Sequence, residues 1–144
     1  MDAMKTLLLA LLACCARPAA ALEAFTQAKF EALQGRNRTI LVQFNAPRCA
    51  VCLHQEVFLG RILQDPVPWA PAVLQAAFDK DEEFKRRCQV TALGTLIVFR
   101  GKQEISRAEG LYTEEGIRSF IQDSLSKSRG RPKPRPATPF KPRP

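Results

Sequence analysis

A run of apolar and β-branched residues, followed by a break and then by a helical pattern, limits the fold of this chain more than any other feature. The run covers residues 39–44 (Thr-Ile-Leu-Val-Gln-Phe), and its near-continuous apolar character predicts a strand covered on both faces. The tripeptide Ala-Pro-Arg breaks it, and a helical pattern then extends from Cys49 to about Leu63. We expect this helix to turn Val57, Phe58 and Ile62 toward the core. A strand covered on both faces needs a helix layer on each side of its sheet.

Helical and strand patterns alternate along the rest of the chain and end in a hairpin and a final helix. Thr113 is expected to cap that helix, whose buried stripe is Ile117, Phe120, Ile121 and Leu125. This order predicts a three-layer α/β/α sandwich around a mixed central sheet of four strands. The expected elements are helix 23–34, strand 39–44, helix 49–63, strand 72–78, helix 79–87, strand 95–100, strand 104–108 and the helix that follows Thr113.

The first 21 residues have the features of an export signal. Lys5 gives a positive start, residues 6–15 form an apolar run of ten, and three alanines end the segment. The run is too short to cross a bilayer as a helix. We therefore expect cleavage near Ala21 and a periplasmic or secreted protein. Lipid anchoring at Cys14 is an alternative form of export, since residues 11–14 (Leu-Leu-Ala-Cys) resemble a bacterial lipoprotein box, but the alanine-rich site beyond it favours simple cleavage.

The positive charge is concentrated in the tail. The formal net charge is +8, yet residues 22–125 hold 13 basic and 13 acidic side chains. Residues 126–144 hold seven basic residues, six prolines and no acid, which predicts a disordered tail. We thus divide the chain into a signal peptide (1–21), one domain (22–125) and this tail. The tail suits weak contact with an anionic surface. Residues 129–133 also resemble an AT-hook, but we do not expect an exported protein to bind DNA.

Cys49 and Cys52 lie three residues apart at the start of the predicted helix. Residues at i and i+3 face the same side of a helical turn, so the two sulfurs can come within bonding distance. Unpaired N–H groups at a helix start favour an anion, so we expect Cys49 to be the attacking thiolate and Cys52 to resolve the mixed disulfide. The pattern predicts disulfide exchange with protein thiols by a monomer. It needs no cofactor beyond this redox-active disulfide, and an unidentified redox partner would recycle it.

Other interpretations of the cysteines stay open. The pair could form a static structural disulfide. Cys49, Cys52, His54 and Cys88 are ligand types that suit zinc, but His54 is expected to point away from the pair, and we expect no metal. Cys88 ends the predicted helix 79–87, where a buried free thiol is the default; the alternative is a third redox thiol or an intermolecular partner.

Several stretches of the chain resemble the thioredoxin family in their order and spacing, over about residues 25–125. The resemblance implies a thioredoxin-like three-layer fold, with Cys49 as the nucleophile and Cys52 as the resolving cysteine. The matching stretches are 40–46 (Ile-Leu-Val-Gln-Phe-Asn-Ala), the Cys-Ala-Val-Cys motif at 49–52, 78–81 (Phe-Asp-Lys-Asp), 95–101 (Thr-Leu-Ile-Val-Phe-Arg-Gly) and Gly110 before the last helix.

The chain departs from the family pattern beside the two cysteines. Arg48 replaces an aromatic residue, and Gln43, which cannot take up a proton, replaces a buried aspartate. Gly94 stands where the family has a cis-proline, directly before Thr95. Since that proline shapes the family's substrate groove, we place Arg48, Gly94 and Thr95 at the groove. Gln43 and Gly94 also support an alternative function, that of a non-catalytic thioredoxin-fold binding module, docked on a surface or a nucleic acid by its basic tail.

Overall fold

Strand β2 (Thr39–Asn45) lies at the centre of a five-stranded sheet in the computed structural model, which describes residues 22–65 and 70–130. Its side chains are buried from Thr39 to Phe44, as its apolar sequence predicts. The strand pairs in parallel with β3 and antiparallel with β4. The sheet order is β1-β3-β2-β4-β5, with β1 at Leu22–Ala24, β3 at Ala72–Ala77, β4 at Thr95–Arg100 and β5 at Gln103–Glu109.

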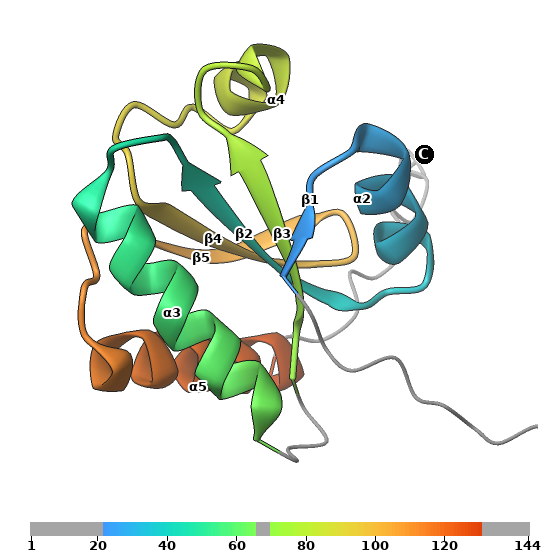
Figure 1. Ribbon diagram of the computed structural model, residues 1–144. Coiled ribbons are helices and arrows are strands. Elements are labelled where there is room, and N and C mark those ends of the chain that lie inside the picture. The colour runs from blue at the N-terminus through green and yellow to red at the C-terminus, as the bar shows by residue number, and fades with distance from the viewer. Residues whose placement is uncertain (1–21, 66–69, 131–144) are drawn as a thin grey trace, which may run out of the picture.

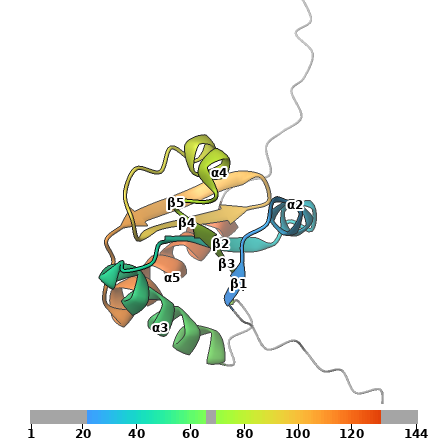
Figure 2. The same ribbon diagram turned by 45° about the horizontal axis from the view of Figure 1, so that its top comes forward.

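Two helices cover each face of the sheet. Figures 1 and 2 show α3 and α5 beside each other on one face, with α2 and α4 on the other. The three-layer α/β/α arrangement expected from the sequence is therefore confirmed. The helices span Gln27–Gly35 (α2), Ala50–Gln64 (α3), Glu82–Arg87 (α4) and Glu114–Gly130 (α5).

The two faces of the sheet have chemically different cores. Under α3 and α5 the core is aliphatic and includes the predicted stripe residues Ile117, Ile121 and Leu125. Under α2 and α4 it is built around aromatic rings. Phe84 of α4 lies at the centre of that cluster, with its ring centroid 4.2 Å from that of Phe25, 5.0 Å from that of Phe30 and 5.6 Å from that of Phe44.

The sheet has five strands, so the expected number of four is wrong. The additional strand is β1, which overlaps the start of the helix that we expected at residues 23–34. Leu22 pairs with Val73, and the N–H of Phe25 donates to Gln75 O at 2.8 Å. The edge of β3 therefore supplies the backbone hydrogen bonds of this segment. Helix α2 begins only after Thr26, whose side chain accepts a hydrogen bond from the Lys29 N–H at 3.2 Å. A three-residue strand carries no periodicity that sequence analysis could detect.

One boundary and one side-chain orientation also differ from expectation. Helix α5 continues to Gly130, so residues 126–130, which we assigned to the tail, are helical. Val57 is 53% exposed, and the buried face of α3 is formed by Cys52, Gln55, Leu59, Ile62 and Leu63. The expected signal peptide and residues 131–144 lie outside the described residues, and none of the described helices is long and apolar enough to span a membrane.

Replacing Phe84 by alanine should destabilise the fold strongly, because this 4% exposed ring stacks on two others and leaves a cavity when removed. We expect the free energy of unfolding in urea to fall by about 3–5 kcal/mol. Tyr112→Ala is the control, since this side chain is 65% exposed and its loss should change stability by about 0.5 kcal/mol or less. Equal losses in the two variants would contradict the central role of Phe84.

Candidate functional site

Cys49 and Cys52 form a disulfide at the start of α3, with their Cα atoms 5.2 Å apart. The turn after β2 leads directly into this helix, so the central strand delivers the pair to one end of the sheet (Figure 1). Cys49 is the N-cap residue, in an extended conformation, and Cys52 lies in the first turn. The expectation that the two sulfurs share one side of the turn is met by this geometry.

The helix start holds the Cys49 sulfur in a polar setting. The Cys52 N–H donates to Cys49 Sγ at 3.2 Å. The sulfur thus takes the place of the side-chain oxygen that accepts this hydrogen bond in an ordinary N-cap. On reduction this donor and the helix dipole stabilise a negatively charged Cys49 thiolate. Cys49 is also the more exposed member, at 8% against 2% for Cys52. The arrangement suits Cys49 for attack and Cys52 for resolution.

A buried glutamine takes the place of a carboxylate beneath the pair. Gln43 on β2 is fully buried, and its Nε2 donates to Cys52 O at 3.0 Å and to Gln55 Oε1 at 3.2 Å. Its Oε1 accepts from Gln75 Nε2 at 3.1 Å. The side chain therefore holds the backbone of Cys52 but offers no group that could accept a proton from the Cys52 thiol at neutral pH.

Gln55 was missed by sequence reasoning, although it lies in the same network. It is fully buried one turn after Cys52, and its Nε2 donates to Gly94 O at 2.8 Å and to Leu111 O at 2.9 Å. The available signal was its spacing. Cys52, Gln55, Leu59 and Ile62 follow at helical intervals, so a polar residue at position 55 falls on the buried face of α3.

Gly94 lies against Val51, one of the two residues between the cysteines. Its φ is +70°, and a Cβ built on it would come within 2.9 Å of Val51 Cγ1, so both its conformation and its surroundings require glycine. Thr95 follows it, but its side chain is fully buried and its hydroxyl donates to Ala92 O at 2.7 Å. Gly94 thus packs against the segment between the two cysteines through Val51, while the Thr95 hydroxyl stabilises the turn that precedes β4.

Arg48 is exposed immediately before Cys49 and adopts a positive φ of 66°, which is uncommon for a residue other than glycine. Its guanidinium makes no ion pair or hydrogen bond with the described residues. Arg48 directly precedes the cysteine that would attack, so its positive charge is in sequence beside the proposed nucleophile.

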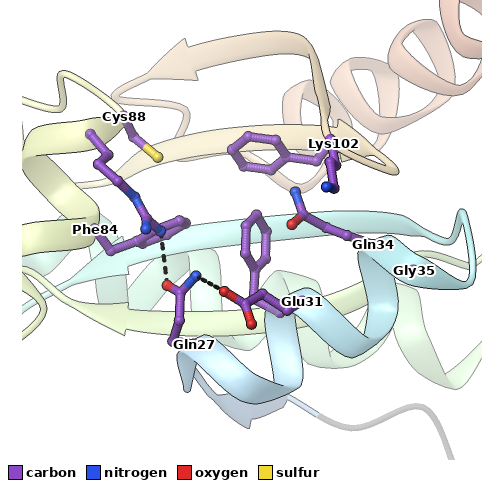
Figure 3. A pocket seen from close by; sticks show the side chains of 10 residues that line it. Gln27, Glu31, Gln34, Gly35, Phe84, Cys88 and Lys102 are labelled. Carbon is purple, nitrogen blue, oxygen red and sulfur yellow. Dashed lines mark hydrogen bonds between the residues drawn. The ribbon is translucent and has the colours of Figure 1, made fainter.

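Cys88 lies in the other layer of the molecule. It follows α4 and packs against the aromatic core, whereas the disulfide belongs to α3 on the opposite face of the sheet. Figure 3 shows its thiol in an open pocket bordered by α2, α4 and the β4–β5 turn, with Gln27, Glu31 and Lys102 among the lining residues. Burial raises the pKa of the Cys88 thiol and Glu104 adds to the increase, which Arg87 and Arg107 oppose. A protonated thiol in a separate layer does not suit a third partner in the exchange.

The residues weighed as zinc ligands do not converge. His54 is exposed on α3, where its ring stacks on Phe58 with the centroids 6.2 Å apart. Across residues 22–65 and 70–130, no three His, Cys, Asp or Glu side chains are arranged to hold a metal ion.

The raised pKa of Cys88 predicts slow alkylation. In the oxidised protein, iodoacetamide should modify Cys88 more slowly at pH 8 than in the urea-unfolded chain, followed by mass of the Cys88 peptide. The rate should keep rising at pH values where that of the unfolded chain has levelled off. Since the folded state favours the protonated thiol, stability should decrease as the pH rises above the pKa of the unfolded thiol. Identical pH profiles in the folded and unfolded states would contradict the assigned environment.

Comparison with known proteins agrees with this architecture. Trxlp from Edwardsiella tarda EIB202 is 25% identical, with a TM-score of 0.63, over 70% of this chain and 98% of that protein. A single-residue mutant of thioredoxin from Halobacterium salinarum NRC-1 is 20% identical, with a TM-score of 0.65, over 76% of this chain and 94% of its own. Oxidised mitochondrial thioredoxin 3 from Saccharomyces cerevisiae is 21% identical, with a TM-score of 0.61, over 71% and 94% of the two chains. The last two similarities concern the fold alone.

A search of curated proteins finds no match to this chain. The family model described as Thioredoxin, however, matches residues 21–123, which is more than half of the sequence. The resemblance seen in the sequence is thereby confirmed. With this match and with a disulfide at the start of the helix that follows the central strand, the chain belongs to the thioredoxin family.

Proposed function

We propose that this protein is an exported thiol–disulfide oxidoreductase that exchanges disulfides with protein thiols through Cys49 and Cys52. The observation that carries the proposal is the disulfide at the N-terminus of α3, whose Cys49 sulfur receives the Cys52 N–H at 3.2 Å. A static crosslink between residues three apart closes only a very short loop, so it adds little stability by restricting the unfolded chain. Its placement at a helix start instead suits reversible chemistry.

The exchange has two steps when the reduced protein acts on a substrate disulfide. The Cys49 thiolate attacks one substrate sulfur, a Cys49–substrate bond forms, and the other substrate sulfur leaves as a thiolate. Cys52 then loses its proton to the departed substrate thiolate or to solvent, and its sulfur attacks Cys49 Sγ, which closes the Cys49–Cys52 disulfide and releases the second substrate sulfur as a thiolate. Two electrons pass from the dithiol to the substrate. A dithiol of another protein would reduce the pair again, and the reverse sequence would oxidise a substrate.

Exposed apolar side chains near the pair support a polypeptide substrate. Leu53 is 59% exposed in the first turns of α3, and Leu93 and Tyr112 are 43% and 65% exposed. Gln55 binds the carbonyls of Gly94 and Leu111. Leu93 is next to Gly94 in sequence, and Tyr112 is next to Leu111. Exposed apolar side chains on the segments that meet at Gln55 suit contact with a partner protein.

The redox potential of the Cys49–Cys52 pair tests this function. We expect a reversible two-electron transition between about −120 and −270 mV, the range of known exchange proteins. The full chain would be equilibrated in a thiol buffer and alkylated, and the mass of the peptide that carries Cys49 and Cys52 would report the pair separately from the other three cysteines. Cys88→Ser is the control for exchange with the third cysteine of the domain.

Two outcomes would contradict the proposal. A pair that stays oxidised below about −300 mV would be a structural disulfide. A pair that never closes would indicate the alternative of a non-catalytic binding module.

In a Cys52→Ser variant that functions as proposed, a mixed disulfide with the substrate should accumulate, whereas Cys49→Ser should form none.

Export is the second part of the proposal and is supported by the apolar leader and its terminal alanines. Cleavage after Ala21 would leave Leu22, the first residue of β1, as the new N-terminus. The intact mass of the protein recovered from the extracytoplasmic fraction should therefore correspond to residues 22–144. A mass that includes residues 1–21 would contradict export by cleavage, and a lipid-modified mass beginning at Cys14 would indicate an anchored form.

A further inference from the structure

The backbone N–H and carbonyl of Gly94 both form hydrogen bonds with other parts of the protein, and these bonds hold the loop that carries it. The Gly94 N–H donates to Phe44 O at 3.0 Å, and its carbonyl accepts from Gln55 Nε2 at 2.8 Å. Both polar backbone groups of this residue are therefore engaged within the protein. Glycine does not restrict its own conformation, so hydrogen bonds of this kind contribute to holding the loop against Val51.

The same Gln55 amide also holds a second loop. Its other N–H donates to Leu111 O at 2.9 Å, while its Oε1 accepts from Gln43. Both donors and the acceptor oxygen of the side chain are thus used, and the side chain is fully buried. Gly94 and Leu111 are 17 residues apart in sequence, and this one side chain ties both to the helical turn that carries Cys52.

We propose that Gln55 is a positioning residue, which holds the Gly94 and Leu111 loops in the arrangement that a protein disulfide requires when it docks beside Cys49 and Cys52. This inference rests on the proposed function. The exposed Leu93 and Tyr112 directly neighbour the two carbonyls that Gln55 binds, so their presentation depends on its hydrogen bonds. None of the Gln55 hydrogen bonds goes to either sulfur, so its effect is on docking rather than on the chemistry of the pair.

The experiment compares a protein substrate with a small one. Gln55→Met keeps the volume of the side chain and removes its hydrogen bonds, and Gln64→Met makes the same chemical change at an exposed position of α3. Dithiothreitol-driven reduction of insulin measures docking of a polypeptide, and exchange of the reduced protein with hydroxyethyl disulfide measures the chemistry without it. Both are measured at a temperature where near-UV circular dichroism shows each full-length variant to be folded.

Gln55→Met should lower kcat/KM for insulin by about tenfold or more, mainly through a higher KM, because a loop displaced by a fraction of an ångström misplaces the substrate. Its rate with hydroxyethyl disulfide should stay within about twofold of the unsubstituted protein, since the dithiol itself is unchanged. Gln64→Met should alter neither rate. Equal losses with both substrates, or no loss with either, would overturn the positioning role.

Amide hydrogen exchange at Gly94 gives a readout that does not need catalysis. If Gln55 holds the loop, exchange of this N–H should accelerate by about tenfold or more in Gln55→Met and stay unchanged in Gln64→Met. Gln55→Asn, whose shorter amide cannot reach both carbonyls, replaces the first variant if that one does not fold. If exchange accelerates in the variant but the unsubstituted protein cannot reduce insulin, the proposed function is refuted. If exchange in the variant is unaltered, the role of Gln55 is refuted.

Discussion

The buried amides of Gln43 and Gln55 impose the constraint on which the dithiol region depends. An amide buried without partners costs about 1–3 kcal/mol for each unsatisfied group, so these side chains need donors and acceptors nearby. They find them in each other, in Gln75 and in three backbone carbonyls, those of Cys52, Gly94 and Leu111. Among the described residues, no buried side-chain nitrogen or oxygen is left without a partner. Two sheet strands, one helix and two loops are thereby joined beneath the disulfide.

This network also explains how the fold accommodates its departures from the family pattern. Gly94 offers no rigid ring, yet its loop is anchored through both of its backbone polar groups. Gln43 offers no carboxylate, yet it holds the carbonyl of Cys52. Neutral groups therefore hold the backbone of Cys52 and the Gly94 loop, and the start of α3 supplies the positive end of a helix dipole at the pair.

The sheet separates two kinds of cysteine. Cys49 and Cys52 belong to the layer of α3 and α5, at a helix start that favours negative sulfur. Cys88 belongs to the layer of α2 and α4, where burial against the aromatic core raises the pKa of its thiol. The sequence places all three in one short chain, and their different chemistry follows from the layer in which each one lies.

The sequence by itself determined the elements whose pattern is local and long. Residues 39–44 are apolar throughout except for Gln43 and Thr39 and form the central strand, the Cys49–Cys52 spacing fits one helical turn, and Ile117, Ile121 and Leu125 repeat at helical intervals. Only the tertiary structure decided the features that need a distant partner. Strand β1 exists because the edge of β3, about 50 residues later in the chain, pairs with it. Gln55 has its role because two separate loops bring their carbonyls to it. Cys88 has its environment because α2 and α4 pack together. Periodicity reports which side of an element is buried, but it carries no information about which groups meet there.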